Sequence, residues 1–256
     1  MTGRNAMATD ARPMDPPSRK LALIAGVLFV ITFITSIPAL LLYDPVLNDP
    51  AYIVGAGADT RVLVGAFLEL LLIVANIGTA LALFGVLRRQ NESLALGYVT
   101  ARLVECGFIA VGILSVLSIV TLRQDGAADD GSLVAIGQSL VAIHDWTFLL
   151  GPGFVVGIGN GLLLGYLMYR SGLVPRRMAV LGLIGGPLLC ASGIAVMFGA
   201  FEAGSPAQIL ATIPEIAWEA SLGIYLIAKG FKTPSGVLDQ ARDAGAGSAT
   251  PAVAAA

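Results

Sequence analysis

Charged residues are scarce in this sequence of 256 residues: Asp, Glu, Lys and Arg make up 12% of it, against about 25% in an average soluble domain. So few charged side chains cannot cover a water-facing surface, which excludes an ordinary soluble protein. Hydrophobic residues make up 56% of the chain, which excludes disorder over most of its length. The formal net charge is −2, so basic residues are not in excess and we expect no nucleic-acid partner.

Histidine and cysteine are scarce too. With a single histidine, His144, the sequence lacks the multi-histidine motifs of zinc sites. Cys106 and Cys190 lie in apolar runs, which excludes a framework of disulfides in water-facing loops. The sequence also shows no paired nucleophile and base. We therefore expect no enzyme activity, no catalytic residues, no metal site and no cofactor.

Long apolar runs are what the sequence has in abundance. A helix that crosses a bilayer needs about 20 mostly apolar residues, and backbone buried in lipid must satisfy its own hydrogen bonds. The sequence therefore predicts an all-α membrane protein, a six-helix transmembrane bundle in a lipid bilayer. The bundle is expected within residues 19–232, with spans at about 21–42, 62–87, 95–122, 146–169, 178–201 and 209–229.

The segments outside these spans are short or polar. Residues 1–18 and 233–256 are rich in polar or small residues, so we expect disordered cytoplasmic tails. Whether residues 132–143 form a short interfacial helix before the fourth span is left open. All but Arg61, Arg102 and Arg123 of the 15 Lys and Arg residues lie in the tails and in the loops after the second and fourth spans. The positive-inside rule then predicts a cell-membrane protein with both termini in the cytoplasm.

Ionisable side chains inside the spans are the sharpest functional indication, because such residues are costly in lipid. Arg102 stays protonated, so at most one span carboxylate has a permanent partner, and the others must be protonated, reach water or bind a cation. Helical spacing adds Asn76 to the face of Glu69. The predicted intramembrane polar site consists of Glu69, Asn76, Arg102, Glu105 and Glu219.

A structural role for the same residues is the alternative. In it, Arg102, Glu105 and Glu69 form a salt-bridge network that holds helices together, at about 0.6 kcal/mol for each hydrogen bond. Glu215 is a weaker candidate, because the segment from Thr212 to Glu215 resembles a capping box with a proline at the helix start.

His144 and Asp145 are also weaker candidates. As an adjacent pair of histidine and acid they would relay protons or sense pH at the outer interface. The alternative is that Asp145 caps the fourth span and His144 lies among lipid headgroups.

Glycines recur every four residues in the fourth span, at Gly153, Gly157, Gly161 and Gly165. Small residues in register let another helix approach closely, so this surface is expected to pack against a helix. The fifth span offers a partner surface at 182–186. Whether the contact forms within one chain, in a homo-oligomer or with another membrane protein is left open.

Several segments together resemble a known bacterial membrane family. They are LELLLIVANIGTALALFGVLRR, which contains Glu69, ARLVE, which ends at Glu105, LMYRSGLVPRRMAVLGLIGG and EASLGIYLIAKGF. Over roughly residues 19–232 the chain resembles domain-of-unknown-function family 4386. The resemblance implies an integral membrane protein of six or seven helices and implies no biochemical activity.

Function therefore has to be argued from the polar site. The first expectation is a carrier or sensor in which Glu69 and Glu219 bind a proton or a small ligand while Arg102 keeps Glu105 ionised. The alternative is a non-catalytic membrane scaffold or accessory subunit whose polar core is structural.

Overall fold

The computed structural model describes residues 19–56, 59–125 and 129–232; the predicted tails, residues 1–18 and 233–256, lie outside this range. The described residues form helices and short connections and contain no strand. The long helices are α1 (Arg19–Asn48), α2 (Thr60–Leu87), α3 (Glu92–Asp125), α4 (Asp130–Phe148), α6 (Arg176–Met197) and α7 (Pro206–Ala228). The short ones are the 3-10 helix η1 (Tyr52–Val54), the π-helices η2 (Leu149–Val155) and η3 (Gly157–Leu164), and α5 (Gly165–Ser171).

Six stretches are long and apolar enough to cross a membrane when the continuous run from α4 to α5 is taken as one. This confirms the predicted all-α bundle of six spans and a multi-pass membrane protein. The fourth span differs most from its predicted bounds, because it begins at Asp130 and extends over 42 residues. Residues 132–143 are therefore the first turns of this span and not a separate interfacial helix.

The start of the fourth span is fixed by Asp129. Its carboxylate accepts hydrogen bonds from the Ser132 backbone N at 3.0 Å and from Ser132 Oγ at 2.7 Å, which satisfies donors that the first helical turn leaves free. The same bonds lower the pKa of Asp129. The predicted capping of this span by Asp145 is therefore wrong, because Asp145 lies well inside α4.

The middle of the fourth span is wound as a π-helix, in η2 and η3. Pro152 lies within η2, where its missing N–H cannot join the regular hydrogen-bond ladder. Short π-helical segments are rare and often occur at functional sites. Here they bring Pro152 and Val156 to the wall of an internal cavity.

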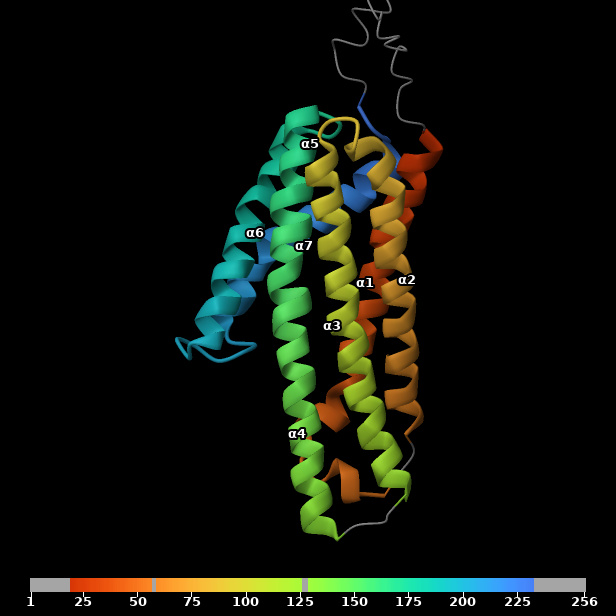
Figure 1. The fold of residues 1–256 in the computed structure, drawn as a ribbon, viewed down its shortest axis with the longest axis vertical. Coiled ribbons are helices and arrows are strands. Elements are labelled where there is room, and N and C mark those ends of the chain that lie inside the picture. Colours follow the sequence, from red (N-terminus) through yellow and green to blue (C-terminus); the bar gives the residue numbers. More distant parts are fainter. Residues whose placement is uncertain (1–18, 57–58, 126–128, 233–256) are drawn as a thin grey trace, which may run out of the picture.

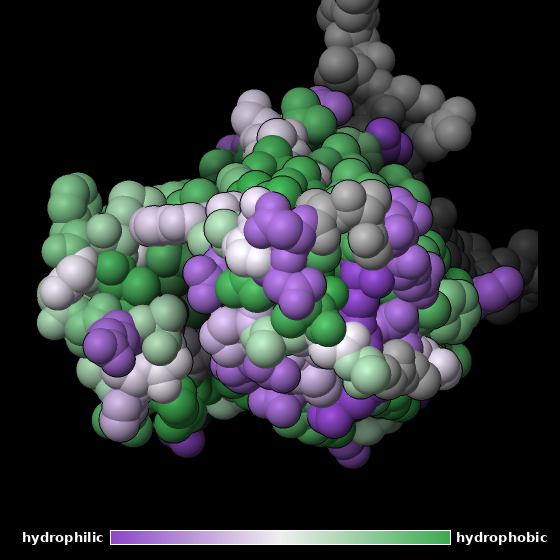
Figure 2. All heavy atoms as spheres, turned by 90° about the horizontal axis from the view of Figure 1, so that it is seen from below, coloured by the Kyte–Doolittle hydropathy of each residue, from purple (hydrophilic) through white to green (hydrophobic). Residues whose placement is uncertain are grey.

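Each long helix packs against its neighbours around the bundle. Helix α1 packs against α2 and α7, and α3 packs against α2, α4, η2 and η3. Helices α6 and α7 form a hairpin whose turn ends part-way along the bundle, while α3 and α4 continue to its lower end (Figure 1). Seen from below, hydrophilic residues gather on the end to which α3 and α4 continue, whereas the α6–α7 hairpin at the left presents mainly hydrophobic residues (Figure 2).

The first and last helices meet at the end of the molecule that carries both termini. Arg19 donates hydrogen bonds to the carbonyl oxygens of Leu226 at 2.8 Å and Ile227 at 2.5 Å in the last turn of α7. The Leu226 carbonyl also accepts from Gly230 N at 3.1 Å. One to two turns further along, a Cβ atom at Gly26 would lie 2.7 Å from the Gly223 carbonyl oxygen. Helices α1 and α7 therefore touch backbone to backbone.

Two apolar cores lie one above the other along the bundle. The core beside the termini contains Phe29, Leu83, Tyr98 and Trp218, and each of these side chains is fully buried. The second core packs around Tyr43, with residues of α2, α3 and α4. On α1, α2 and α3, polar residues such as Ser36, Asn76 and Arg102 lie between the two cores, and they line the cavity described next.

Candidate intramembrane binding site

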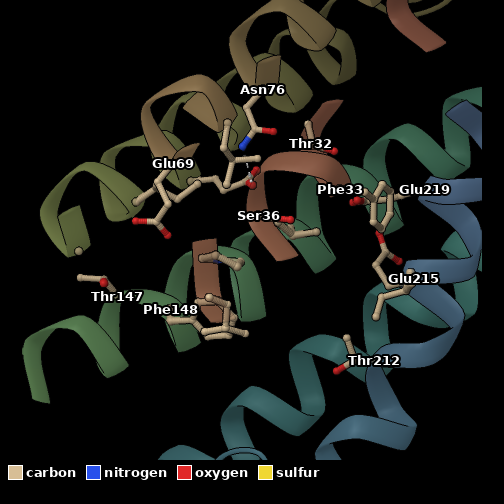
Figure 3. Close-up of a pocket in the computed structure, with 18 of the residues that line it drawn as sticks. Thr32, Phe33, Ser36, Glu69, Asn76, Thr147, Phe148, Thr212, Glu215 and Glu219 are labelled. Atoms are coloured by element: carbon tan, nitrogen blue, oxygen red, sulfur yellow. Dashed lines mark hydrogen bonds between the residues drawn. The ribbon is translucent and has the colours of Figure 1, made fainter. Parts of the chain in front are cut away.

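A cavity of about 200 Å³ separates the two apolar cores. Its wall comes from α1, α2, α3, α6, α7 and the fourth span. All five residues of the predicted polar site line it, as do the weaker candidates Glu215 and His144 (Figure 3); together they are Glu69, Asn76, Arg102, Glu105, His144, Glu215 and Glu219. Asp145 does not line this cavity, because its carboxyl faces a separate surface pocket and is 63% exposed.

Arg102 is the buried cation of the cavity. Its Nη1 lies 2.7 Å from Glu105 Oε2, and its Nη2 donates to Asn76 Oδ1 at 2.7 Å and to Thr79 Oγ1 at 3.3 Å. Asn76 Nδ2 in turn donates to Glu105 Oε1 at 2.9 Å. Arg102, Glu105 and Asn76 thus close a ring of hydrogen bonds between α2 and α3. This ring occupies both terminal nitrogens of the one guanidinium among the residues that line the cavity, whereas Arg102 Nε has no hydrogen-bond partner among the described residues.

Glu69 faces the opposite part of the cavity and is not bound to Arg102. Tyr43 OH donates to Glu69 Oε2 at 2.9 Å. The ring of His144 meets the Tyr43 ring edge-on at 5.7 Å and stacks on Phe148 at 6.5 Å. His144 is 4% exposed, so its expected place among lipid headgroups is wrong. Glu69 therefore has a phenol as its partner and a histidine close by.

Glu219 is held by the π-helical part of the fourth span. Asn160 Nδ2 donates a hydrogen bond to Glu219 Oε1. The backbone of the same asparagine accepts a hydrogen bond from Trp218 Nε1 at 2.9 Å. Asn160 thereby binds two successive residues of α7, Trp218 and Glu219.

Glu215 is the carboxylate for which the structure provides no partner. It is 2% exposed, and neither Oε1 nor Oε2 has a hydrogen-bond partner among the described residues. It lies where two glycines leave room: a Cβ atom at Gly161 would come within 2.8 Å of Glu215 Oε2, and one at Gly185 within 2.7 Å. The side chain projects from α7 on the same side as Glu219, one turn away (Figure 3).

The capping role expected for Glu215 is wrong. Helix α7 begins at Pro206, and its N-cap is Ser205, whose Oγ accepts from the Gln208 backbone N at 3.5 Å. Glu215 lies more than two turns inside the helix. A Ser-Pro pair is itself typical of a helix start, so the sequence contained the correct indication several residues earlier.

The balance of charge follows from these contacts. Four glutamates and one arginine line a single cavity, and the arginine is already paired with Glu105. Two ionised carboxylates placed side by side in a low-dielectric site repel each other strongly. Glu215 and Glu219 can be charged together only if a positive charge lies between them. In the described part of the chain, no group of three or more His, Cys, Asp and Glu residues is arranged to hold a metal ion.

The chain can be assigned to a family at this point. A family model described as a domain of unknown function, DUF4386, matches residues 24–230. The chain belongs to this family. No curated protein and no solved structure matches it.

Within this DUF4386 chain, the glycines of the fourth span pack against α6. A Cβ atom at Gly157 would lie 2.7 Å from the Gly186 carbonyl oxygen, and one at Gly165 would lie 3.3 Å from Leu183 N. Gly161 lies against Gly186 too. Gly153 has only its own helix within 4 Å and takes no part. The contact forms within one chain.

The sequence reasoning missed two residues that shape the site of this DUF4386 chain. Tyr43, the partner of Glu69, lies near the C-terminal end of the first span, where a tyrosine is usually an interfacial anchor. Asn160 is separated from Glu219 by 59 positions. Its polar side chain inside an otherwise apolar run was the available indication, but a single sequence does not show which helix it faces.

Proposed function

We propose that this protein binds a small monovalent cation at Glu215 and Glu219, as a carrier or a sensor. The observation that carries the proposal is the unpartnered, buried carboxylate of Glu215 in a cavity whose only guanidinium among the described residues is already paired. Such an arrangement is expensive unless a proton or a cation neutralises it. The proposal assigns binding to the cavity and no catalytic step.

Protons compete with the cation in this proposal. When Glu215 and Glu219 are protonated, the pair is neutral and offers no charge to a cation. When they are ionised, a cation between them relieves their mutual repulsion. Binding is therefore expected to strengthen as the pH rises, which would couple cation occupancy to the proton concentration.

Cation binding can be followed by the fluorescence of Trp218, which lies between Glu215 and Glu219 in the sequence of α7. The protein has two tryptophans, and Trp146 is 48% exposed, so Trp146→Phe leaves Trp218 as the reporter. In nanodiscs, ethylammonium chloride is titrated at constant ionic strength at about pH 8 and at about pH 6, because a protonated carboxyl offers no charge to the cation. We expect a saturable fluorescence change that is weaker at the lower pH.

Glu215→Gln keeps the shape of the side chain and removes its charge. We expect this variant to bind ethylammonium about tenfold more weakly, the effect of losing roughly 1.4 kcal/mol of charge-assisted contact. The matched control is Glu202→Gln, which changes an exposed glutamate in the loop before α7. Equal binding by wild type and Glu215→Gln would contradict the proposal, and so would the absence of binding in both.

A purely structural polar core is the second candidate, and the closed ring of Arg102, Glu105 and Asn76 favours it. The two candidates differ in what a neutral substitution does. As a scaffold, the protein would lose stability in Asn76→Leu and Glu215→Gln alike. As a cation-binding protein, it would lose stability in Asn76→Leu, whereas Glu215→Gln would become more stable while losing binding.

The orientation proposed is both termini in the cytoplasm of a cell-membrane protein. The end of the bundle with the α2–α3 and α5–α6 connections carries Arg88, Arg89, Arg170, Arg176 and Arg177, together with Arg19 of α1. Positively charged loops remain on the cytoplasmic side. The cavity then opens in the half of the membrane nearer the outer surface, beside the α6–α7 turn.

A further inference from the structure

The mouth of the cavity is apolar, in contrast to its interior. Leu40 of α1, Phe148 of α4 and Ile216 of α7 all line the cavity, yet they are 45%, 46% and 50% exposed. These three residues come from separate helices and are both part of the wall and part of the outer surface. They define the mouth of the cavity.

No helix closes the gap between the two sides of this mouth. Helix α7 packs along α1 and α6 and reaches the fourth span through η3, but it makes no extended contact with α4 or η2 in the described structure. In Figure 1 the α6–α7 hairpin leans away from α4 toward its turn. The mouth therefore lies on the side of the bundle and not at its end.

The surface around the mouth is apolar too. Ile37 on α1, Ile143 on α4 and Ile213 on α7 are 56%, 45% and 50% exposed. All three lie in stretches long and apolar enough to cross a membrane. Side chains of this kind in membrane-spanning segments face hydrocarbon, so the mouth opens toward the acyl chains of the bilayer.

A path through the mouth therefore leads from lipid to unpaired negative charge. Glu215 lies one residue from Ile216 along α7, with its carboxylate turned inward. Phe33 and Phe148 both line the cavity and add aromatic rings to its wall (Figure 3). A hydrated ion makes no favourable contact with such an apolar mouth. A molecule with both a charged and an apolar part can place its charge at the carboxylates and its apolar part in the mouth.

We infer that the ligand of this cavity is an amphiphilic organic cation that enters from the bilayer, with its ammonium head at Glu215 and Glu219 and its apolar part in the mouth formed by Leu40, Phe148 and Ile216. This inference rests on the proposed function and adds the ligand class and the route. The lipid concentrates such a molecule, by up to about fourfold for each methylene transferred out of water. It delivers the molecule at the depth of the mouth.

The test compares ethylammonium, hexylammonium and dodecylammonium with 1-dodecanol. Trp146→Phe protein in phosphatidylcholine nanodiscs is titrated at a fixed lipid concentration, and the half-saturating total concentration is read from Trp218. If the route passes through lipid, dodecylammonium should half-saturate at a concentration about tenfold or more below that of ethylammonium. 1-Dodecanol, which has the tail without the charge, should not produce a saturable change.

The mouth itself is tested by narrowing it. Leu40→Phe combined with Ile216→Phe should weaken dodecylammonium binding about fivefold or more, the cost of overpacking a formed contact. It should weaken ethylammonium binding much less, because ethylammonium has almost no chain to place in the mouth. The matched control is Ile224→Phe, which places the same side chain on the lipid-facing surface of α7, where Ile224 is 62% exposed and does not line the cavity.

Failure of the inference can be told apart from failure of the proposed function. If ethylammonium binds but dodecylammonium binds more weakly, because the lipid withdraws it from water, the cavity is reached from water and the inference is overturned. If 1-dodecanol binds as tightly as dodecylammonium, the mouth takes apolar chains regardless of charge, and the inference is again overturned. If no ammonium ion binds, the proposed function itself fails.

Discussion

The residues that decide this site differ in how completely their polar atoms are satisfied. Arg102, Glu105 and Asn76 bind one another at 2.7–2.9 Å, and Arg102 Nε alone of their polar side-chain atoms has no partner in the described residues. Glu69 and Glu219 have one partner each, Tyr43 and Asn160. Glu215, whose two oxygens have no partner in the described residues, completes the series. The carboxylates thus range from Glu105, which has partners for both oxygens, to Glu215, which has none. A ligand contributes most to stability beside the carboxylate without partners.

A second ionic cluster, outside the membrane-spanning segments, also bears a prediction. Asp59 accepts hydrogen bonds from Tyr52 OH at 2.8 Å and from Gln124 Nε2 at 3.0 Å, and forms an ion pair with Arg123. Burial by itself would raise the pKa of Asp59. The hydrogen bonds and the Arg123 charge outweigh it, so the pKa lies below 3.8.

A carboxyl whose pKa is lower in the folded state stabilises the fold at pH values above its unfolded pKa, and this contribution is lost as the pH falls through the folded pKa. We therefore expect the melting temperature of the purified protein to decrease when the pH is lowered below 3.8. Asp59→Asn should lower it at neutral pH and flatten this acid limb. Asp49→Asn, in the same outer region, is the control; an identical acid limb in wild type and Asp59→Asn would refute the assignment.

At the level of single residues, the sequence predicted which side chains come together better than how they are bound. An ionisable group inside an apolar run is visible without a structure, so Glu69, Arg102, Glu105 and Glu219 could be named. Their partners come from other helices and could not be. Glu215 shows the limit most clearly, because its local context favoured a cap, and only the position of α7 relative to α6 shows that it lies in the cavity.

Among the elements, the contact between the fourth span and α6 is the closest-packed. The two backbones approach at Gly157 and Gly186, where a Cβ atom would lie 2.7 Å from a carbonyl oxygen. Gly157→Ala should therefore destabilise the protein by about 1–3 kcal/mol, because a methyl group cannot be accommodated without moving backbone. The readout is the thermal unfolding of the purified protein in detergent.

The control for this substitution is Gly107→Ala in α3, where nothing lies within 4 Å of the added methyl group. Alanine is the better helix former by about 0.5–1 kcal/mol, so this variant should be unchanged or slightly more stable. Equal melting temperatures for Gly157→Ala and wild type would show that the two helices are less closely packed than described.

Element boundaries were predictable where composition changes and not where it stays apolar. The ends of α2 lie close to Arg61 and Arg88, which punctuate the sequence. The fourth span instead begins at Asp130, 16 residues before its expected start, because residues 132–143 are moderately apolar and carry no breaker. The π-helical winding of η2 and η3 was not predictable, since glycine and proline in a span are compatible with several backbone geometries.

For the molecule as a whole, the predicted orientation can be tested directly. Ala203→Cys places a thiol in the connection between α6 and α7, and Gln90→Cys places one between α2 and α3. We expect a membrane-impermeant maleimide to label the first in intact cells and the second only after the membrane is opened. The reverse pattern would invert the proposed topology. The unsubstituted protein, with Cys106 buried and Cys190 partly buried, measures the background.

The hydrogen bonds from Arg19 to the last turn of α7 have a consequence for synthesis of the protein. Of the described helices, α1 is translated first, and it finds its partners for Arg19 and Gly26 on α7. Helix α1 can pair early with α2, but its other face waits until about 200 further residues have been translated. A nascent chain arrested before α7 would therefore leave this face of α1 uncovered in the membrane.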